Sequence, residues 1–255
     1  MKIRETDKKT KIQKIIHDLN KLADPEKAKL FLRFFKTGKG EYGEGDRFLG
    51  VTVPNTRLIA KKYKNIPMGD LQELLSSKIH ELRLCALMIL RFQYESSFAN
   101  LPAGKAGASK GKQDKFRIVN FYLKNTKYIN NWDLVDLSAS YIIGNWLLDR
   151  DRGLLYRLVR SKSLWERRIA VISTFEFIKN NQFEDSLKIS EILLNDKHDL
   201  IHKAVGWMLR ELGKRDQKLE EDFLKKHYKK MPRTMLRYAI EKFSKEKRDY
   251  YLKLT

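Results

Sequence analysis

Hydrophobic residues recur along this chain at the three- and four-residue spacing of amphipathic helices. In residues 11–23 the apolar positions are Ile12, Ile15, Ile16, Leu19 and Leu22. Residues three and four apart lie on one face of a helix, so this spacing predicts a helix with one buried face. Similar stretches follow at residues 26–36, 54–64, 68–76, 79–94, 114–125, 131–148, 152–160, 164–179, 182–194, 198–213, 216–228, 231–243 and 245–253. No segment has the convincing alternation of a strand, so we expect an all-α protein.

Two segments interrupt the helical pattern. Residues 37–54 contain five glycines and are expected to form a surface loop. Their glycine spacing does not match a phosphate-binding loop, which ends in Gly-Lys-Ser/Thr. Residues 102–115 are rich in glycine, alanine and lysine and lack apolar periodicity. We therefore expect a flexible basic insertion at about 102–115.

The helical segments also repeat. Five of them can be aligned on an alanine: Ala86, Ala139, Ala170, Ala204 and Ala239. The last three spacings are 31, 34 and 35 residues, and the longer first spacing contains the 102–115 insertion. Alanine recurs in any helical protein, but a period in the thirties is typical of helix-hairpin solenoids. Residues 1–255 are thus predicted to form one domain, a curved solenoid of antiparallel helix hairpins whose concave face could carry basic side chains.

The charge of the chain indicates an anionic partner. Its 53 lysines and arginines exceed its 32 aspartates and glutamates, which gives a net charge of +21. Such an excess favours nucleic acid or an anionic membrane surface, with a merely solvated lysine-rich surface as the alternative. The basic residues are spread along the whole chain, which favours a long basic surface.

The remaining composition favours a soluble protein of a reducing compartment. Cys85 is the only cysteine, so no disulfide can form within the chain. The N-terminal residues lack the apolar region of a signal peptide, and no apolar run reaches the ~18 residues of a membrane span. We expect a monomer in a bacterial or archaeal cytosol, associated with the nucleoid.

The segment NNWDLVD, residues 130–136, combines an aromatic ring with a carboxylate. Trp132 and Asp136 are four residues apart and would share one face of a helix. Trp132 can also be read as a core indole, and Asp136 as half of a structural ion pair. Asp133 is interpreted as a first-turn acid that the helix dipole favours.

Two further segments combine tryptophan with basic residues at helical spacing. They contribute Trp165, Arg167 and Arg168, and then Lys203, Trp207 and Arg210. Arg167 and Arg168 are adjacent and point about 100° apart, so only one of them is expected to face a given ligand. His198 and His202 are four residues apart but lack a third ligand, so no metal site is expected.

Four segments together resemble one known family, the AlkD-like DNA alkylation-repair glycosylases, which are built of HEAT-like repeats. They are FLGVTVPNTR (48–57), NWDLVD (131–136), LWERRIA (164–170) and KAVGWMLRE (203–211). The resemblance extends from about residue 25 to residue 245. It implies that Trp132 and Asp136 line the lesion site, that Arg168 binds DNA nearby and that Trp207 completes an aromatic wall.

Other DNA contacts are assigned less directly. Lys203 and Arg210 are candidate DNA-binding residues beside Trp207. The N-terminal helices match the family poorly, so Tyr42 and Phe48 are only candidates for an aromatic DNA contact there. The 102–115 insertion has no counterpart in the family.

The resemblance implies hydrolytic excision of positively charged N3- or N7-alkylated purines, such as 3-methyladenine and 7-methylguanine, from double-stranded DNA. Asp136 would stabilise the oxocarbenium-like sugar and orient a water. No cofactor is implied, and no lysine stands out as a Schiff-base nucleophile, so we expect a monofunctional glycosylase of base excision repair. The alternatives are a non-catalytic HEAT-repeat protein that binds DNA or RNA structures, and a protein-binding scaffold.

Overall fold

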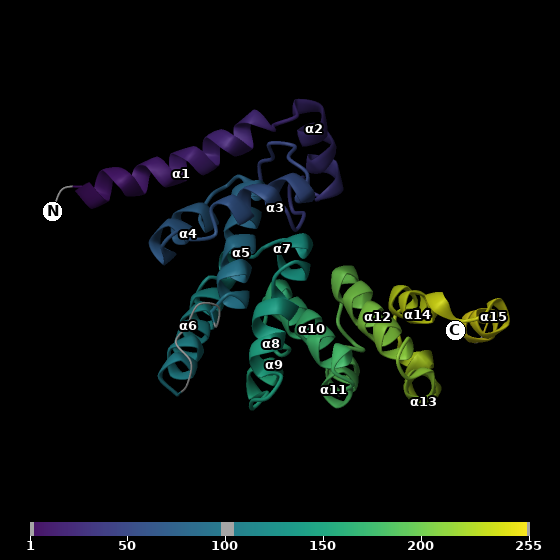
Figure 1. The fold of residues 1–255 in the computed structure, drawn as a ribbon. Helices are drawn as coiled ribbons and strands as arrows, with labels where there is room; N and C mark the ends of the chain where they lie inside the picture. The colour runs from purple at the N-terminus through teal and green to yellow at the C-terminus, as the bar shows by residue number, and fades with distance from the viewer. Residues whose placement is uncertain (1–2, 98–104, 254–255) are drawn as a thin grey trace. The chain divides into compact units, whose positions relative to one another are not determined.

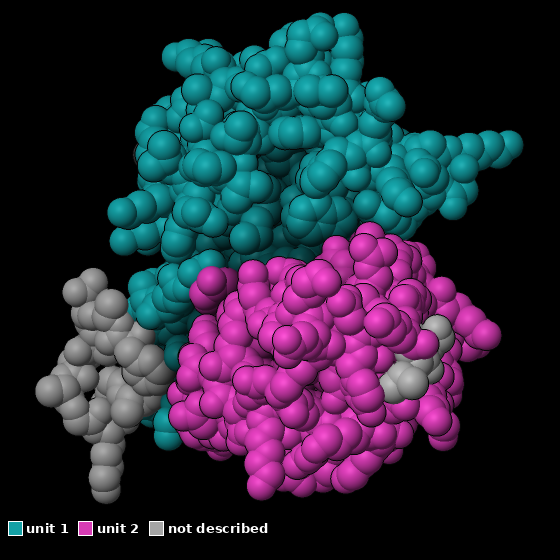
Figure 2. Space-filling view, turned by 90° about the vertical axis from the view of Figure 1, so that its right-hand side faces the viewer, with its two compact units in different colours: residues 1–138 teal, residues 139–255 magenta. Residues whose placement is uncertain are grey.

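The structure, a computed structural model, describes residues 3–97 and 105–253. These residues form helices and connecting turns, and no strand occurs among them (Figure 1). An isolated bridge joins Arg47 to Ile79. The predicted all-α class is therefore confirmed. The chain divides into two compact units, residues 1–138 and 139–255, coloured separately in Figure 2.

Unit 1 is organised around one almost fully buried helix, α5. Its helices are α1 (Ile3–Lys21), α2 (Pro25–Phe34), α3 (Val53–Lys62), α4 (Met68–Leu75), α5 (His80–Glu95), α6 (Lys105–Lys124), the 3-10 helix η1 (Thr126–Tyr128) and α7 (Trp132–Asp136). Helices α3, α4, α6 and α7 all contact α5. Helix α2 differs, because none of its residues is buried and Phe34 is 62% exposed.

Unit 2 is a succession of short helices around two long ones. It contains the π-helical turn η2 (Ser140–Gly144), α8 (Asn145–Leu147), α9 (Gly153–Leu158), α10 (Leu164–Lys179), α11 (Glu184–Ile192), α12 (Asp199–Gly213), α13 (Gln217–His227), η3 (Tyr228–Lys230), α14 (Arg233–Ala239), η4 (Ile240–Lys242) and α15 (Lys245–Lys253). Helix α10 packs against η2 and α12, and α12 packs against α14. Alternate helical elements, in the order η2, α10, α12 and α14, thus pack on one another, as expected for a stack of hairpin repeats.

The alanine repeat marks these stacked helices. All five aligned alanines are buried, with 0% exposure at Ala139, Ala170 and Ala204. Between η2 and α10 the backbones approach so closely that a Cβ on Gly144 would lie 2.4 Å from the carbonyl oxygen of Ser173. Small residues at these positions permit the close helix packing that the repeat predicts. The curvature of the whole chain and its concave basic face stay predictions.

Besides shifts at the ends of several helices, two predictions differ from the structure. The stretch 131–148 is not one helix, because α7 ends at Asp136 and the side chain of Ser138 bonds the carbonyl oxygen of Leu134 at 2.5 Å. A serine that bonds the backbone in this way bends a helix and competes with its continuation. The expected flexible insertion is wrong for residues 105–115, which form the first half of α6. Alanine and lysine favour helix even without apolar periodicity. Residues 102–104 lie outside the described residues.

No helix among the described residues is both long and apolar enough to cross a membrane.

Candidate active site

The short helix α7 carries both residues of the strongest sequence motif. It begins after the buried Asn131, whose side-chain oxygen accepts a hydrogen bond from the backbone N–H of Trp132 at 2.8 Å. Trp132 and Asp136 are its first and last residues, and both are half-buried. The predicted i, i+4 placement on one helix is confirmed. Both side chains therefore retain some contact with solvent.

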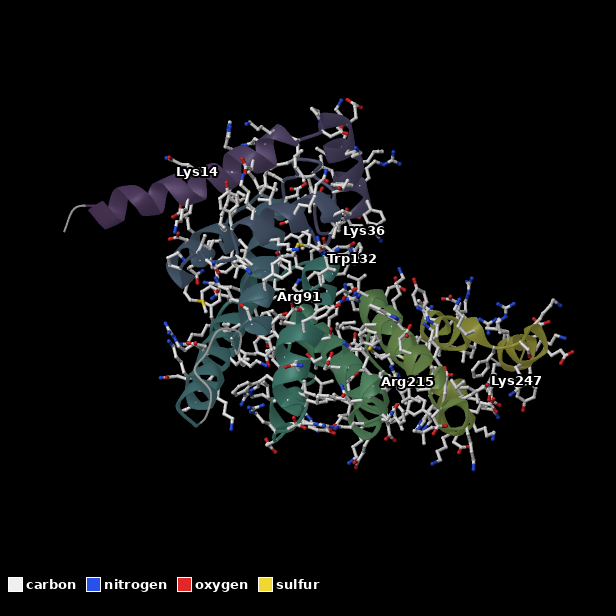
Figure 3. All side chains as sticks on the ribbon, viewed as in Figure 1. Lys14, Lys36, Arg91, Trp132, Arg215 and Lys247 are labelled. Atoms are coloured by element: carbon white, nitrogen blue, oxygen red, sulfur yellow. The ribbon has the colours of Figure 1, made fainter. Side chains whose placement is uncertain are left out.

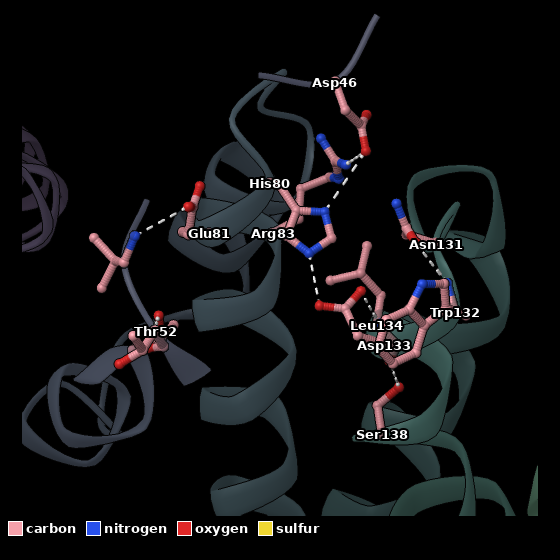
Figure 4. A network of polar contacts seen from close by, with 12 residues as sticks. Asp46, Thr52, His80, Glu81, Arg83, Asn131, Trp132, Asp133, Leu134 and Ser138 are labelled. Carbon is pink, nitrogen blue, oxygen red and sulfur yellow. Dashed lines mark hydrogen bonds and ion pairs between the residues drawn. The ribbon is translucent and has the colours of Figure 1, made fainter. Parts of the chain in front are cut away.

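Asp133 is the first-turn acid of α7 that the sequence predicted, and it also forms a buried ion pair. Its side chain is 5% exposed, and its Oδ2 lies 2.8 Å from Nε2 of His80 (Figure 4). On the other side of the ring, Nδ1 of His80 lies 3.6 Å from Oδ2 of Asp46, which Arg83 also binds at 2.6 Å. Two acids and two bases thus form a buried network that joins the 35–52 loop, α5 and α7.

The network holds His80 in its protonated form. Burial opposes the charge, but the adjacent carboxylates of Asp133 and Asp46 outweigh burial and raise the pKa of His80 to about 9. Burial likewise disfavours ionised Asp46, yet His80 and Arg83 hold the pKa of Asp46 below its usual range. Two basic side chains, His80 and Arg83, thus face two acidic ones, Asp46 and Asp133, inside unit 1.

Trp132 belongs to an aromatic cluster above this network. Its ring stacks on Phe35, with centroids 5.4 Å apart and planes 20° apart, and Phe35 stacks in turn on Phe48 at 5.0 Å. The His80 ring lies 4.9 Å from Phe35 and 4.8 Å from Phe48. The exposed ring of Phe34 meets Trp132 edge-on at 5.7 Å. The motif tryptophan therefore adjoins an exposed aromatic surface.

The loop that contributes Phe48 is fixed by a buried carboxylate. Glu81 accepts hydrogen bonds from the backbone N–H groups of Leu49 at 3.0 Å, Gly50 at 2.9 Å and Val51 at 3.3 Å. Gly50 has φ +82°, and a Cβ there would lie 2.1 Å from the carbonyl oxygen of Asp24. Only glycine fits this close approach. Of the two N-terminal candidates, Phe48 joins the aromatic cluster, and Tyr42 lies half-buried in the same loop.

Asp136 lies near a buried phenol. Burial raises the pKa of Tyr122 well above its usual range, and the negative charge of Asp136 adds to the shift. The Tyr122 hydroxyl is 2.9 Å from Oγ of Ser138, which itself donates to the carbonyl oxygen of Leu134. Tyr122 therefore serves as the donor toward Ser138. This arrangement fixes the turn that follows Asp136.

The other predicted site residues lie on two packed helices of unit 2. Arg168 of α10 is 4% exposed, and its Nη1 donates to the carbonyl oxygen of Leu200 at 2.5 Å. Trp207 of α12 is half-buried, and its Nε1 donates to Glu211 at 3.1 Å. The burial of Arg168 favours a structural bond more than an open phosphate contact. Its predicted role in DNA binding stays a prediction.

The basic candidates beside Trp207 are paired with acids. Lys203 lies 2.7 Å from Asp199, with its side chain 39% exposed, and Arg210 forms an ion pair with Glu241. Arg167 is bound more firmly, to Asp196 at 2.7 Å and to the carbonyl oxygen of Ser161 at 3.0 Å. Exposed ion pairs of the Lys203 type contribute little to stability.

Sequence reasoning missed Phe34, Phe35 and His80. The adjacent phenylalanines stand at the end of a predicted helix, just before the glycine-rich loop, and His80 opens α5, a helix rich in buried apolar residues. A charged residue at the start of an apolar helix is a signal for a buried partner, but sequence does not identify the partner.

The described chain contains no group of three or more potential metal ligands from histidine, cysteine, aspartate and glutamate. His198 and His202 instead bond backbone groups, Leu200 N–H and the carbonyl oxygen of Asp196. Basic side chains project along the described chain, including Lys14 on α1 and Lys247 on α15 (Figure 3). The described residues thus include a half-buried carboxylate, exposed aromatic rings and many cationic side chains.

Comparison with known proteins agrees with these features. The profile of the DNA alkylation repair enzyme family matches residues 15–243. The fold is similar to that of a protein from Enterococcus faecalis described as a predicted DNA alkylation repair enzyme, with a TM-score of 0.64 and 15% identity. The match covers 88% of this chain and 97% of that one. No curated protein matches the sequence. The family profile extends across both units, and the chain belongs to the DNA alkylation repair enzyme family.

Proposed function

We propose that this protein is a monofunctional DNA glycosylase that excises N3- or N7-alkylated purines, such as 3-methyladenine and 7-methylguanine, by hydrolysis. The observation that carries the proposal is α7, where half-buried Asp136 shares a five-residue helix with Trp132 in a chain of net charge +21. The carboxylate of Asp136 would repel the phosphates of DNA, so its place beside Trp132 in a strongly basic protein needs an explanation. A positively charged alkylated purine is such an explanation, because the carboxylate would attract it.

The chemistry requires little beyond one carboxylate. An alkylated purine already carries a positive charge and leaves as a neutral base, so a strong general acid is unnecessary. The sugar becomes oxocarbenium-like, and Asp136 stabilises that charge and orients the attacking water. Two unit charges 4 Å apart interact by about 4 kcal/mol at an effective dielectric of 20. This corresponds to about a thousandfold in rate, as an upper value, because the cationic ground state gains part of the same attraction.

The aromatic cluster supplies affinity for the lesion. A ring face attracts a cation by about 0.5–2 kcal/mol. Trp132 and the 62% exposed Phe34 offer such surfaces beside α7. The proposed capture uses aromatic contact with a cationic nucleotide and needs no hydrogen bonds to base edges.

Unit 2 is proposed to bind the DNA backbone. Trp207, Lys203, Arg210 and Arg168 are the assigned contacts. Phosphates would replace Asp199 beside Lys203 and Glu241 beside Arg210 on binding. Release of counterions from DNA makes such binding steeply salt-dependent. The enzyme is proposed to act as a monomer in the cytoplasm, on double-stranded DNA and without a cofactor.

The test is release of free base from methylated duplex DNA under single-turnover conditions. Wild-type protein is expected to release 3-methyladenine or 7-methylguanine, and Asp136→Asn to lose about 100-fold or more in rate, the size typical for loss of one charge-stabilising group. Asp149→Asn makes the same chemical change at an exposed position and is the control, with no change expected.

Two outcomes contradict the proposal. Wild-type protein that releases neither base above background is not such a glycosylase, and retention of full rate by Asp136→Asn removes Asp136 from the mechanism. Tight DNA binding without base release would instead identify a non-catalytic DNA-binding protein.

A further inference from the structure

Helix α7 is too short to hold its own orientation. It has five residues, and isolated helices shorter than about 12 residues are marginal in water. Both proposed substrate-facing residues, Trp132 and Asp136, depend on its placement. Contacts from other segments must therefore fix the helix.

His80 is linked to this helix in two ways, directly through Asp133 and indirectly through Phe35. The first is the buried 2.8 Å ion pair between its Nε2 and Oδ2 of Asp133, one residue after Trp132. The second is aromatic, because the His80 ring lies 4.9 Å from Phe35, which stacks on Trp132 at 5.4 Å. His80 itself is 2% exposed, so it cannot contact a DNA substrate.

The charges around His80 determine what its loss would do. The ring faces Asp133 on α7, Asp46 in the 35–52 loop and Arg83 on its own helix α5. With His80 protonated, the two acids and two bases balance. Without that proton, two buried carboxylates face one arginine, and the repulsion acts directly on the first turn of α7.

We infer that His80 is a positioning residue for lesion excision, holding Trp132 and Asp136 in place through Asp133 and Phe35. The inference rests on the proposed glycosylase function for its catalytic readout. The contacts between His80, Phe35 and Trp132 also allow a second test, by NMR, which does not need catalytic activity. A displacement of about 1 Å at a reacting group can cost about 100-fold in rate.

The catalytic experiment compares His80→Gln and Asp133→Asn with wild type on methylated duplex DNA. Each variant is expected to lose about 100-fold in single-turnover rate, while its affinity for undamaged duplex stays within about threefold of wild type. The matched control is Asp185→Asn, which removes a part-buried acid bound to Arg152 at 2.5 Å and Tyr156 at 2.6 Å in unit 2. That variant is expected to excise within about threefold of wild type. Full excision by His80→Gln overturns the inference and leaves the glycosylase function intact.

The second experiment follows the indole N–H resonances of the tryptophans by NMR as pH is raised. The Trp132 resonance is expected to shift with the titration of His80 near pH 9, and to be displaced in His80→Gln with Trp207 unaffected. The titration uses wild-type protein, so the test survives if a variant does not fold. If the Trp132 resonance does not shift as His80 loses its proton, the inference is overturned, whatever the excision assay gives. If wild type excises nothing yet Trp132 follows His80, the positioning role stands and the glycosylase proposal fails.

Discussion

The two tryptophans of the family motifs, Trp132 and Trp207, are held in place by different kinds of interaction. Trp132 stands on the five-residue helix α7, whose neighbours in space come from residues far away in sequence, such as His80 and Phe35. Trp207 stands on the 15-residue helix α12, which packs on α10, α13 and α14. One position therefore depends on buried charge pairs and ring stacking, and the other on periodic apolar packing.

The buried acids of the two units show the same contrast. In unit 1, Asp46 and Asp133 are buried beside His80 and Arg83, so their charges are matched. In unit 2, Glu220 is 2% exposed, and burial, with the neighbouring charge of Glu221, raises its pKa to about 8. Asp46 and Asp133 thus have cationic partners, whereas burial keeps Glu220 protonated at neutral pH.

The largest effect is expected from removal of a cation from the unit 1 network. Arg83→Met leaves Asp46 buried with one cation fewer and removes the 2.8 Å bond to the carbonyl oxygen of Ser77. Breaking a buried charge pair costs about 3–5 kcal/mol, so the free energy of unfolding should fall by that amount in chemical denaturation.

The control lies two turns along the same helix. Arg91 pairs with Glu95 at 2.7 Å, with the two side chains 21% and 43% exposed. Arg91→Met makes the same substitution at a solvent-screened pair and should cost about 1 kcal/mol or less. Equal losses in the two variants would contradict the importance of the buried network.

Periodicity explains why much of the fold could be predicted. The helices expected at 164–179 and 198–213 match α10 and α12 to within one residue, because helices of this length repeat their apolar spacing over several turns. The break after Asp136 and the helix at 105–115 were not predicted. The first depends on a bond between Ser138 and Leu134, and the second on propensity without an apolar face.

The site was less predictable than the fold. The motif indicated Trp132 and Asp136, but it did not indicate that Asp133 is buried against a histidine 53 residues earlier in the chain. Ion pairs between distant segments leave no periodic trace in a sequence. Stacking of Phe35 on Trp132 is likewise a consequence of tertiary packing and not of local pattern.

The second prediction concerns the pH dependence of unit 2. Folded Glu220, with its pKa near 8, keeps its proton at pH values where the unfolded chain, with a pKa near 4.5, has lost it. Stability is therefore lost as pH rises between about 4.5 and 8, by up to about 1.4 kcal/mol for each pH unit. Glu220→Gln should remove this loss and become more stable than wild type toward pH 8, as measured by denaturant unfolding across pH.

A matched glutamate tests whether burial is the cause. Glu184 occupies the first turn of α11, as Glu220 does in α13, but it is 77% exposed and pairs with Lys188. Glu184→Gln should change the free energy of unfolding by about 0.5 kcal/mol or less, with no trend across this range. Parallel pH profiles for wild type and Glu220→Gln would show that Glu220 ionises normally.

The smallest effect is expected where unit 2 relies on close backbone approach. A Cβ on Gly206 would lie 2.4 Å from the carbonyl oxygen of Met235 and 2.6 Å from Cβ of Tyr238. Gly206→Ala must therefore push α14 away from α12, at a cost of about 1–3 kcal/mol that a gain of up to about 1 kcal/mol in helix propensity partly offsets. We expect a net loss of about 1–2 kcal/mol in the free energy of unfolding.

The same variant separates the two tryptophans. Gly206 precedes Trp207, so the Trp207 indole resonance should move, whereas that of Trp132, held by charge pairs and stacking, should not. Gly153→Ala is the control, because a Cβ there would meet only the side-chain carboxylate of Asp151, at 2.9 Å, and no backbone atom. The free energy of unfolding of that variant should then be unchanged or up to about 1 kcal/mol higher, because alanine favours a helix more than glycine does. If Gly206→Ala moved both resonances equally, Trp132 would depend on helix packing in unit 2 as well as on its buried charges, and the contrast between the two positions would not hold.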